Sequence, residues 1–193
     1  MEESTFMTTP ITLATVPVFD LIRQWGSDRN LILGATPKDQ FGKLIEEFGE
    51  ITDGLEEENY AEIKDGIGDT AVVLTILAAQ MGLTGEECFE YASGLGYQIK
   101  QFEDEADYSM YIRSIVSQMG KIASGISKKN LPKTKEGIGH ALGLLVPLAE
   151  CLLVDESFDD ALLASYNVIK DRKGKMIDGV FVKEADLHMV GGQ

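Results

Sequence analysis

Three acidic side chains lie within about one and a half helical turns, at Glu46, Glu47 and Glu50. Spacings of three and four residues place them on one helical face. A second acidic stripe follows at similar spacings, at Glu62, Asp65 and Asp69. Carboxylates packed so closely repel one another unless a cation or a proton lies between them. Oxygen ligands in this number suit Mg²⁺ or Mn²⁺ rather than Zn²⁺, so the two stripes predict a divalent-metal site if their helices pair.

An acidic stripe is more often a solvated surface than a site, but an internal repeat argues against that alternative. The segment from Leu44 to Ala79 aligns without a gap on the segment from Ile115 to Glu150. Both copies keep a loop asparagine and a Gly-Ile-Gly motif, and with one inserted residue Ala92-Ser93 then match Ala164-Ser165. We interpret this as a tandem duplication of a helical hairpin plus a third helix.

The two copies differ at the acidic positions. Glu46, Glu47 and Glu50 are replaced in the second copy by Ser117, Gln118 and Lys121. The second stripe is replaced by Lys133, Glu136 and His140. A surface that only confers solubility has no reason to lose these charges together while the scaffold residues are retained. The first copy is therefore predicted to be active and the second to be structural.

The glycines of the repeated motif lie inside predicted helices, where each costs roughly 1 kcal/mol relative to alanine. They are Gly66 and Gly68 in the first copy, and Gly137 and Gly139 in the second. We expect close backbone approach to offset this cost, with the two copies of this helix crossing at their small residues about a pseudo-two-fold axis. A kinked or frayed helix start is the alternative.

The predicted fold is an all-α helical bundle, with residues 1–193 forming one domain. Its first repeat spans residues 18–103, and residues 104–185 hold the degenerate repeat and a C-terminal segment. Residues 1–17 are expected to be an irregular leader. Helices are predicted over about 18–28, 37–53 (with Gly54 as the residue that ends the helix), 59–81 and 84–100. A small hairpin is predicted at Asp178-Gly179.

The composition points to a globular protein with an acidic surface. The formal net charge is −15, which disfavours binding to nucleic acids or to anionic membranes. No signal sequence opens the chain, and the longest mostly apolar run, Ala71 to Ala79, is far too short to cross a bilayer. We expect a cytoplasmic protein in which Cys88 and Cys151 are reduced, buried thiols.

The acidic motifs resemble those of the all-α NTP pyrophosphohydrolases, which include MazG-like enzymes, phosphoribosyl-ATP pyrophosphohydrolase and dimeric dUTPases. Their pattern is Glu-Glu-x-x-Glu on one helix and Glu-x-x-Asp on the next. Glu46, Glu47 and Glu50 match the first half, and Asp69 matches the end of the second. The second glutamate of the pattern would fall on Gly66, so either Asp65 or Glu62 takes its place. The resemblance covers roughly residues 18–185 and is closest to MazG-like proteins of the kind that phages encode.

The resemblance implies a Mg²⁺-dependent hydrolase that converts a (d)NTP to a (d)NMP and pyrophosphate. The implied metal ligands are Glu47, Glu50, Asp65 and Asp69, and Mn²⁺ is an alternative metal. Glu46 is the candidate for activating the water, since crowding by its neighbours would make it a stronger base. A non-catalytic helical module that binds a nucleotide or a divalent metal for regulation is the alternative function.

The C-terminal stretch from Tyr166 to Lys175 is among the most basic in the chain. It resembles the closing segment of dimeric dUTPases and MazG-like proteins, which implies that Asn167, Lys170, Arg172 and Lys173 contact the phosphates. Basic residues near a helix C-terminus are often only partners of the helix dipole. The degenerate repeat would replace the second protomer of a MazG dimer, which gives a pseudo-dimeric chain; formation of a homodimer is left open.

The nucleotide base needs a pocket of its own, and the residues that precede the acidic helix are candidates for it. Trp25 offers a stacking face, and Arg29, Asn30 and Gln40 offer polar groups. A tryptophan at helical spacing is more often part of the core. Lys43, one turn before Glu47, is expected either to touch a phosphate or to pair with a carboxylate.

Overall fold

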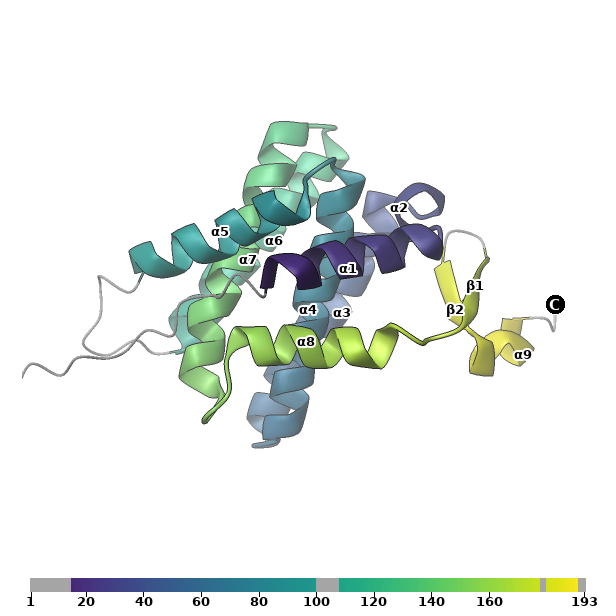
Figure 1. Cartoon of the computed structure of the whole chain (residues 1–193). Coiled ribbons are helices and arrows are strands. Elements are labelled where there is room, and N and C mark those ends of the chain that lie inside the picture. Colours follow the sequence, from purple (N-terminus) through teal and green to yellow (C-terminus); the bar gives the residue numbers. More distant parts are fainter. Residues whose placement is uncertain (1–14, 100–107, 178–179, 191–193) are drawn as a thin grey trace, which may run out of the picture.

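The computed structural model describes residues 15–99, 108–177 and 180–190, and it confirms the all-α class (Figure 1). The helices of the first repeat and of the segment before it are α1 (Thr15–Asp28), α2 (Leu31–Gly34), α3 (Pro37–Glu56), α4 (Tyr60–Gln80) and α5 (Gly85–Ile99). The second repeat comprises α6 (Tyr108–Ser127), α7 (Leu131–Leu152) and α8 (Phe158–Ile169). A hairpin of β1 (Gly174–Ile177) and β2 (Val180–Lys183) follows, then a 3₁₀ turn (Glu184–Asp186) and α9 (Leu187–Val190).

The ends of these elements largely follow the sequence pattern. The hairpin is antiparallel, with Ile177 opposite Val180; the predicted turn residues Asp178 and Gly179 lie outside the described residues. Residues 15–17 belong to α1 rather than to an irregular leader, and the rest of the predicted leader lies outside the described residues. Helix α3 begins as expected, with Thr36 as the N-cap, Pro37 at the first helical position and Asp39 completing a capping box with Thr36.

The prediction that Gly54 ends α3 was wrong. The helix continues to Glu56, and Glu58 adopts the left-handed conformation with φ of 53°. A Cβ at Gly54 would lie 3.0 Å from the backbone nitrogen of Ile63. Gly54 is therefore needed where the first turn of α4 folds back against α3. The second copy repeats this arrangement, with Lys129 also at φ of 53°.

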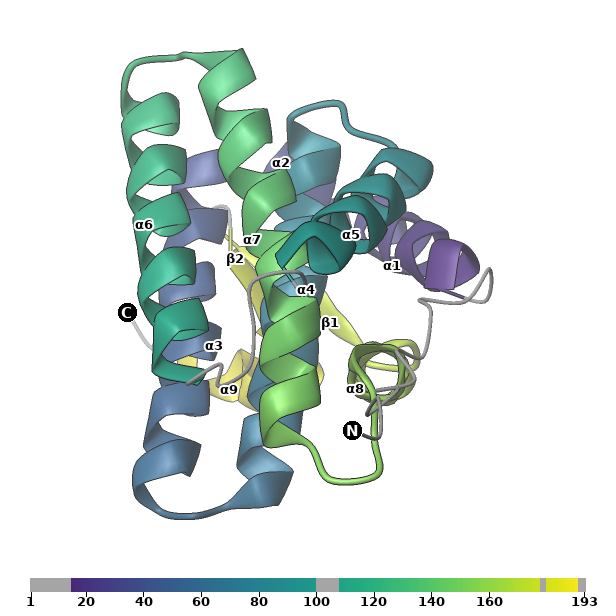
Figure 2. The same ribbon diagram turned by 90° about the vertical axis from the view of Figure 1, so that its left-hand side faces the viewer.

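The helices stack in three layers, which Figure 2 shows from the side. The outer layer is formed by α3 and α6, the middle layer by α4 and α7, and the third layer by α1, α5 and α8, which cross the middle helices (Figures 1 and 2). Residues 70–78 of α4 and 141–149 of α7 are all buried. A helix covered on every side is apolar all round, which explains why these two segments carry almost no polar residues.

Two of the repeated glycines let the helices of each hairpin approach closely. A Cβ at Gly66 would lie 2.8 Å from Cγ1 and 3.0 Å from the backbone nitrogen of Ile51 on α3. A Cβ at Gly137 would lie 2.9 Å from Cγ1 of Ile122 on α6. Close backbone approach is thus confirmed, but its partner is the other helix of the same hairpin. The expectation that these glycines mark a crossing of α4 with α7 was wrong.

The other two glycines contact the third helix of the opposite copy. At Gly68 a Cβ would collide with the Ala161 carbonyl and the Ser165 hydroxyl on α8, and at Gly139 it would collide with the Tyr91 ring on α5. Helix α8 of the second copy therefore packs on α4 of the first, and α5 of the first copy packs on α7 of the second. The two copies exchange their third helices, so each hairpin is completed by a helix from the other copy.

One hydrophobic cluster runs through both copies. Cys88 belongs to it, and burial raises the pKa of its thiol to about 12. Cys151 is exposed, so the expectation of two buried thiols was wrong for that residue; neither cysteine forms a disulfide. None of the helices in the described ranges has both the length and the apolar character that a bilayer crossing requires.

Candidate metal and phosphate site

The acids of the first copy lie where α3 and α4 pack most closely. Glu47 is buried, although glutamate is among the most exposed residue types. Its backbone carbonyl would lie 3.4 Å from a Cβ at Gly66, so α4 passes directly over the turn of α3 that carries Glu47. Asp69 follows Gly66 by one helical turn on α4. The predicted antiparallel hairpin is formed by α3 and α4, and it brings part of each acidic stripe together, namely Glu47 and Glu50 with Asp69.

Three carboxylates of this region are close enough to perturb one another. Burial and the negative charge of Glu47 raise the pKa of Asp69 to about 6, and the neighbouring Asp65 adds to the increase. Burial and the same Glu47 carboxylate also raise the pKa of Glu50. Like charges that raise each other's pKa favour either a proton or a cation between them. Glu47, Glu50 and Asp69 therefore form one electrostatic unit that joins α3 to α4.

Lys43 supplies a cation to this unit from within α3. Its Nζ lies 2.6 Å from the Glu47 carboxylate and 2.8 Å from that of Glu46. Burial disfavours the Lys43 ammonium, but these two partners outweigh the penalty and raise its pKa. Glu46 itself is exposed. The close approach of several carboxylates that was expected around Glu46 is found instead around Glu47, Glu50 and Asp69.

Asp65 and Glu62 were the alternatives for the fourth ligand. The Asp65 carboxylate contributes to the raised pKa of Asp69 and therefore lies near it. Glu62 is engaged at the start of α4, where its Oε2 accepts a hydrogen bond of 3.0 Å from Nδ2 of Asn59, the N-cap residue. The geometry thus favours Asp65 over Glu62 as the neighbour of Asp69.

Helix α8 brings residues of the second copy to the acids of the first. The Arg172 guanidinium, just beyond α8, offsets part of the increase in the pKa of Asp69 and so lies within electrostatic range of it. The Ser165 hydroxyl acts in the same direction. Neither Ser165 Oγ nor Asp69 Oδ1 has a hydrogen-bond partner of ordinary geometry, although both atoms are buried. The site is therefore built by both copies, and it holds a basic group beside the carboxylates.

The segment that carries Arg172 is held in place by Trp25 of α1 and by Arg29, which directly follows α1. The Trp25 indole donates a hydrogen bond of 2.7 Å to the Ile169 carbonyl. The Arg29 guanidinium donates to the carbonyls of Lys170 and Arg172 at 2.8–3.0 Å and stacks over the Trp25 ring, 4.9 Å from its centroid. These contacts fix the backbone between α8 and β1 beside the acidic unit.

The remaining predicted substrate residues are placed as follows. Trp25 is 9% exposed, with its other ring neighbour, Phe181, at a centroid distance of 6.2 Å. Gln40 is also buried, whereas Asn30 is exposed and adopts the left-handed conformation. Lys170 and Lys173 are exposed, as is Asn167, whose Oδ1 accepts a hydrogen bond of 2.9 Å from Lys170 Nζ. Thus Arg172 is the basic side chain of this segment whose charge acts on Asp69.

The acidic unit offers oxygen ligands of the kind that Mg²⁺ and Mn²⁺ prefer. In the part of the chain that the structure describes, no three His, Cys, Asp or Glu side chains converge into a ready-made metal centre. Instead, the Glu47 carboxylate is paired with Lys43. The buried Asp69 Oδ1 without a partner and the mutual repulsion of the acids are what a divalent cation would relieve. The donor atoms are therefore of the type that suits such an ion, although the described side chains do not converge on one point.

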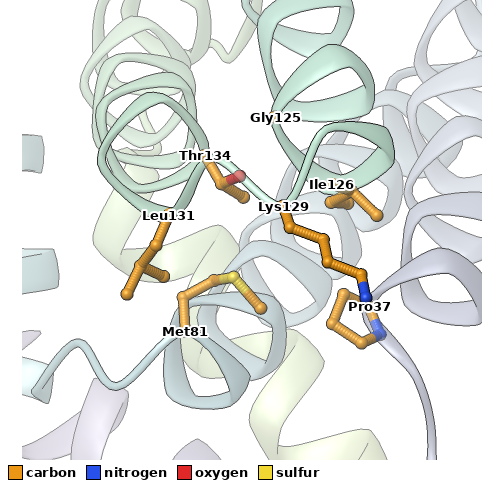
Figure 3. A pocket seen from close by; sticks show the side chains of 7 residues that line it. All are labelled: Pro37, Met81, Gly125, Ile126, Lys129, Leu131 and Thr134. Carbon is orange, nitrogen blue, oxygen red and sulfur yellow. The ribbon is translucent and has the colours of Figure 1, made fainter.

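A cavity of about 210 Å³ opens elsewhere in the bundle, between Pro37 at the start of α3, Met81 after α4 and the α6–α7 turn (Figure 3). None of the candidate site residues lines it. Figure 3 shows apolar side chains around it, with Lys129 reaching across toward Pro37. Pockets for drug-sized ligands usually measure about 300–1,000 Å³, so this cavity is small for a nucleotide.

Sequence reasoning missed one residue of the site and misjudged the surroundings of another. Ser165 stands out in the sequence only as part of the repeat, because a serine retained in both copies carries no sign of which copy uses it. Arg29 was assigned to the base pocket with Trp25, but its donors are used by backbone carbonyls. The exchange of third helices brings α8, and with it Ser165, beside the first copy. A single sequence carries no signal of this exchange.

Comparison with known proteins yields one relative of limited extent. The chain is 52% identical over 59 residues to a protein described as "Uncharacterized 18.2 kDa protein in rep-hol intergenic region" from Haemophilus phage HP1 (strain HP1c1). The match covers 31% of this chain and 36% of that protein. No protein-family profile matches the chain, and no solved structure is detectably similar.

Proposed function

We propose that the protein is a Mg²⁺-dependent nucleoside triphosphate pyrophosphohydrolase that converts a (d)NTP and water to a (d)NMP and pyrophosphate. The observation that carries the proposal is the electrostatic unit of Glu47, Glu50 and Asp69: burial and the Glu47 carboxylate together raise the pKa of Glu50 on α3 and of Asp69 on α4. The sequence resemblance described above assigns the same three residues to the metal site.

The second line of support is that the site combines opposite charges. A triphosphate carries about four negative charges and cannot approach a carboxylate surface unless cations intervene. Glu47, Glu50, Asp65 and Asp69 would hold Mg²⁺, with Mn²⁺ as an alternative. Bound Mg²⁺ would neutralise the triphosphate and favour attack of water on a phosphorus atom of the α–β anhydride; the bridging P–O bond would break and pyrophosphate would leave.

The chain's own basic groups would then contact the substrate. Arg172 already lies near Asp69, and a guanidinium suits phosphate oxygens because it can donate two parallel hydrogen bonds. Lys43 would leave Glu47 when a metal binds, and its ammonium would then be available to a phosphate. The exposed Lys170 and Lys173 supply further positive charge on the same segment. Glu46 is kept as the candidate base for the attacking water, although it is exposed and paired with Lys43 rather than crowded by other acids.

The test is pyrophosphate release from a panel of dUTP, dCTP, dATP and dGTP in the presence of Mg²⁺. Wild-type protein is expected to release pyrophosphate from at least one of them. Glu47→Gln and Asp69→Asn each remove one negatively charged ligand at nearly constant volume, so activity should fall by at least about 100-fold. Glu46→Gln should lower kcat if Glu46 activates the water.

The repeat provides a matched control. His140 stands in the second copy where Asp69 stands in the first, and His140→Ala should leave pyrophosphate release within about twofold of wild type. Binding of nucleotide without any pyrophosphate release would favour a non-catalytic regulatory module. Failure to bind either Mn²⁺ or a nucleotide would rule out both functions.

A further inference from the structure

Two serines occupy equivalent positions in the exchanged third helices, Ser93 on α5 and Ser165 on α8. Ser93 behaves as a helical serine usually does: its Oγ donates a hydrogen bond of 2.8 Å to the carbonyl of Phe89, one turn earlier in its own helix. Ser165 has no such bond, although it is 1% exposed and its Oγ is fully buried. Its hydroxyl lies instead against α4.

The absence of a Cβ at Gly68 makes this arrangement possible. A Cβ there would collide with both the Ser165 hydroxyl and the Ala161 carbonyl, which is the acceptor that a back-bonded Ser165 would use. Asp69 follows Gly68 directly, and its buried Oδ1 has no hydrogen-bond partner. The Ser165 hydroxyl also acts on the Asp69 carboxyl, so a buried hydroxyl donor and a buried carboxylate oxygen lie close together between α4 and α8.

The two copies differ at this point in a way that matches their acids. The first copy has Asp69 opposite Ser165, and that serine is free of its own helix. The second copy has His140 in place of Asp69, and Ser93 is bonded to its own helix. The serine is therefore released from its helix only where a carboxylate is present to accept from it.

We infer that Ser165 is a positioning residue of the metal site: its hydroxyl would donate to the buried oxygen of Asp69 when a metal binds, and would so hold the other oxygen toward the metal. This inference rests on the proposed function, since it needs Asp69 to be a ligand. A ligand fixed by a hydrogen bond from a neighbouring group binds its metal more tightly because its orientation is set in advance. Ser165 touches neither metal nor substrate.

The test measures Mn²⁺ binding to the full chain by water-proton relaxation, which also follows weak binding. Ser165→Ala should weaken Mn²⁺ binding about tenfold, as expected for the loss of one hydrogen bond to a charged group. Ser93→Ala removes the same hydroxyl from the equivalent helix and should leave Mn²⁺ affinity unchanged. Circular dichroism and the unfolding midpoint of each variant establish that it is folded.

A double-mutant cycle separates positioning from a structural effect. If Ser165 acts through Asp69, adding Ser165→Ala to Asp69→Asn should weaken Mn²⁺ binding by less than about twofold further. An equal tenfold loss in both backgrounds, or an equal loss in Ser93→Ala, would overturn the inference. So would wild-type affinity in Ser165→Ala while Asp69→Asn binds weakly. If Asp69→Asn itself binds Mn²⁺ like wild type, the proposed metal site fails, and the inference fails with it.

Discussion

The ammonium of Lys43 lies 2.6 Å from the carboxylate of Glu47, whose side chain is 7% exposed while that of Lys43 is 46% exposed. The buried acid is thus neutralised by a half-exposed base one helical turn away. In the proposed function, Lys43 takes the place of a metal ion when none is bound. This relationship leads to the first of four predictions.

Replacing Lys43 with methionine should destabilise the metal-free protein and increase its response to Mn²⁺. The variant leaves Glu47 buried without its cation, which we expect to cost about 1–2 kcal/mol because Lys43 is only half buried. Mn²⁺ no longer has to displace an ammonium, so it should raise the unfolding midpoint of the variant by more than that of wild type. Thermal unfolding with and without Mn²⁺ measures both effects.

Lys121→Met is the control for this experiment. Lys121 pairs with Glu136 at 3.4 Å, and both side chains are substantially exposed. Exposed pairs contribute about 0–1 kcal/mol, so the midpoint should change little and should not respond differently to Mn²⁺. An equal response of the two variants would contradict the assigned role of Lys43.

The raised pKa of Asp69 predicts how stability depends on pH. The carboxyl titrates near 3.8 when exposed and at about 6 in the folded protein. Between these values the folded state binds more protons than the unfolded state, so this group lowers stability as pH rises from about 4 to 7. Asp69→Asn removes that dependence. At pH 7 its free energy of unfolding should exceed that of wild type by on the order of 2 kcal/mol.

Urea denaturation of wild type and Asp69→Asn at pH 4, 5, 6 and 7, without divalent cations, measures the difference. The difference in free energy of unfolding between Asp69→Asn and wild type should grow with pH and should level off above pH 7. Other acids also make stability depend on pH, such as Asp160, whose pKa is lowered by hydrogen bonds from Ser157. Their contribution is the same in wild type and Asp69→Asn, so it cancels when the two proteins are compared. A difference that shrinks toward neutral pH would mean that Asp69 is not held among other carboxylates.

Replacing two helical glycines with alanine should change the stability of the protein in opposite directions. Gly68→Ala places a methyl group against the Ala161 carbonyl and the Ser165 hydroxyl, and we expect a loss of about 2 kcal/mol or more, as for overpacking in a core. No atom outside its own helix lies within 4 Å of a Cβ at Gly120. Gly120→Ala should therefore stabilise by about 0.5–1 kcal/mol through helix propensity. Chemical denaturation of both variants tests this pair, and stabilisation by Gly68→Ala would refute the contact between α4 and α8.

Trp25→Phe should affect stability more than substrate binding. The indole is 9% exposed and donates to the Ile169 carbonyl, which also accepts from the backbone nitrogen of Arg172. The acceptor therefore keeps one partner, and loss of the indole hydrogen bond should cost about 0.5–1.5 kcal/mol. We expect the KM for the preferred nucleotide to stay within about threefold. A rise of tenfold or more in KM with unchanged stability would show that Trp25 stacks on the base after all.

Much of this arrangement follows from local patterns. Acids three and four residues apart share a helical face whatever the rest of the fold does, so residue spacing places Glu47 and Glu50 on one face of their helix. That Asp69 of the next helix belongs to the same candidate site was implied by the family resemblance. The repeat likewise located both hairpins, because a loop asparagine caps the second helix of each: Asn59 Oδ1 accepts from the Glu62 nitrogen, and Asn130 Oδ1 from that of Lys133.

Other features depend on contacts between distant segments, and there the expectations failed. The glycine pattern predicts close approach, but it is the same whether the partner is α7, α3 or α8. Glu46 and Glu47 are adjacent in sequence, yet one is exposed and the other buried, since a rotation of about 100° per residue separates their directions. The sequence pattern therefore could not identify which of the two lies in the crowded region.

The amino-acid sequence by itself determined that the chain is helical, that it is duplicated, and which copy keeps the carboxylates, because helix periodicity and residue identity are local properties. Only the tertiary structure decided that the third helices are exchanged, so that Ser165 and Arg172 of the second copy face Asp69 of the first. The physical reason is that an amphipathic helix specifies the face it buries but not the helix it is buried against.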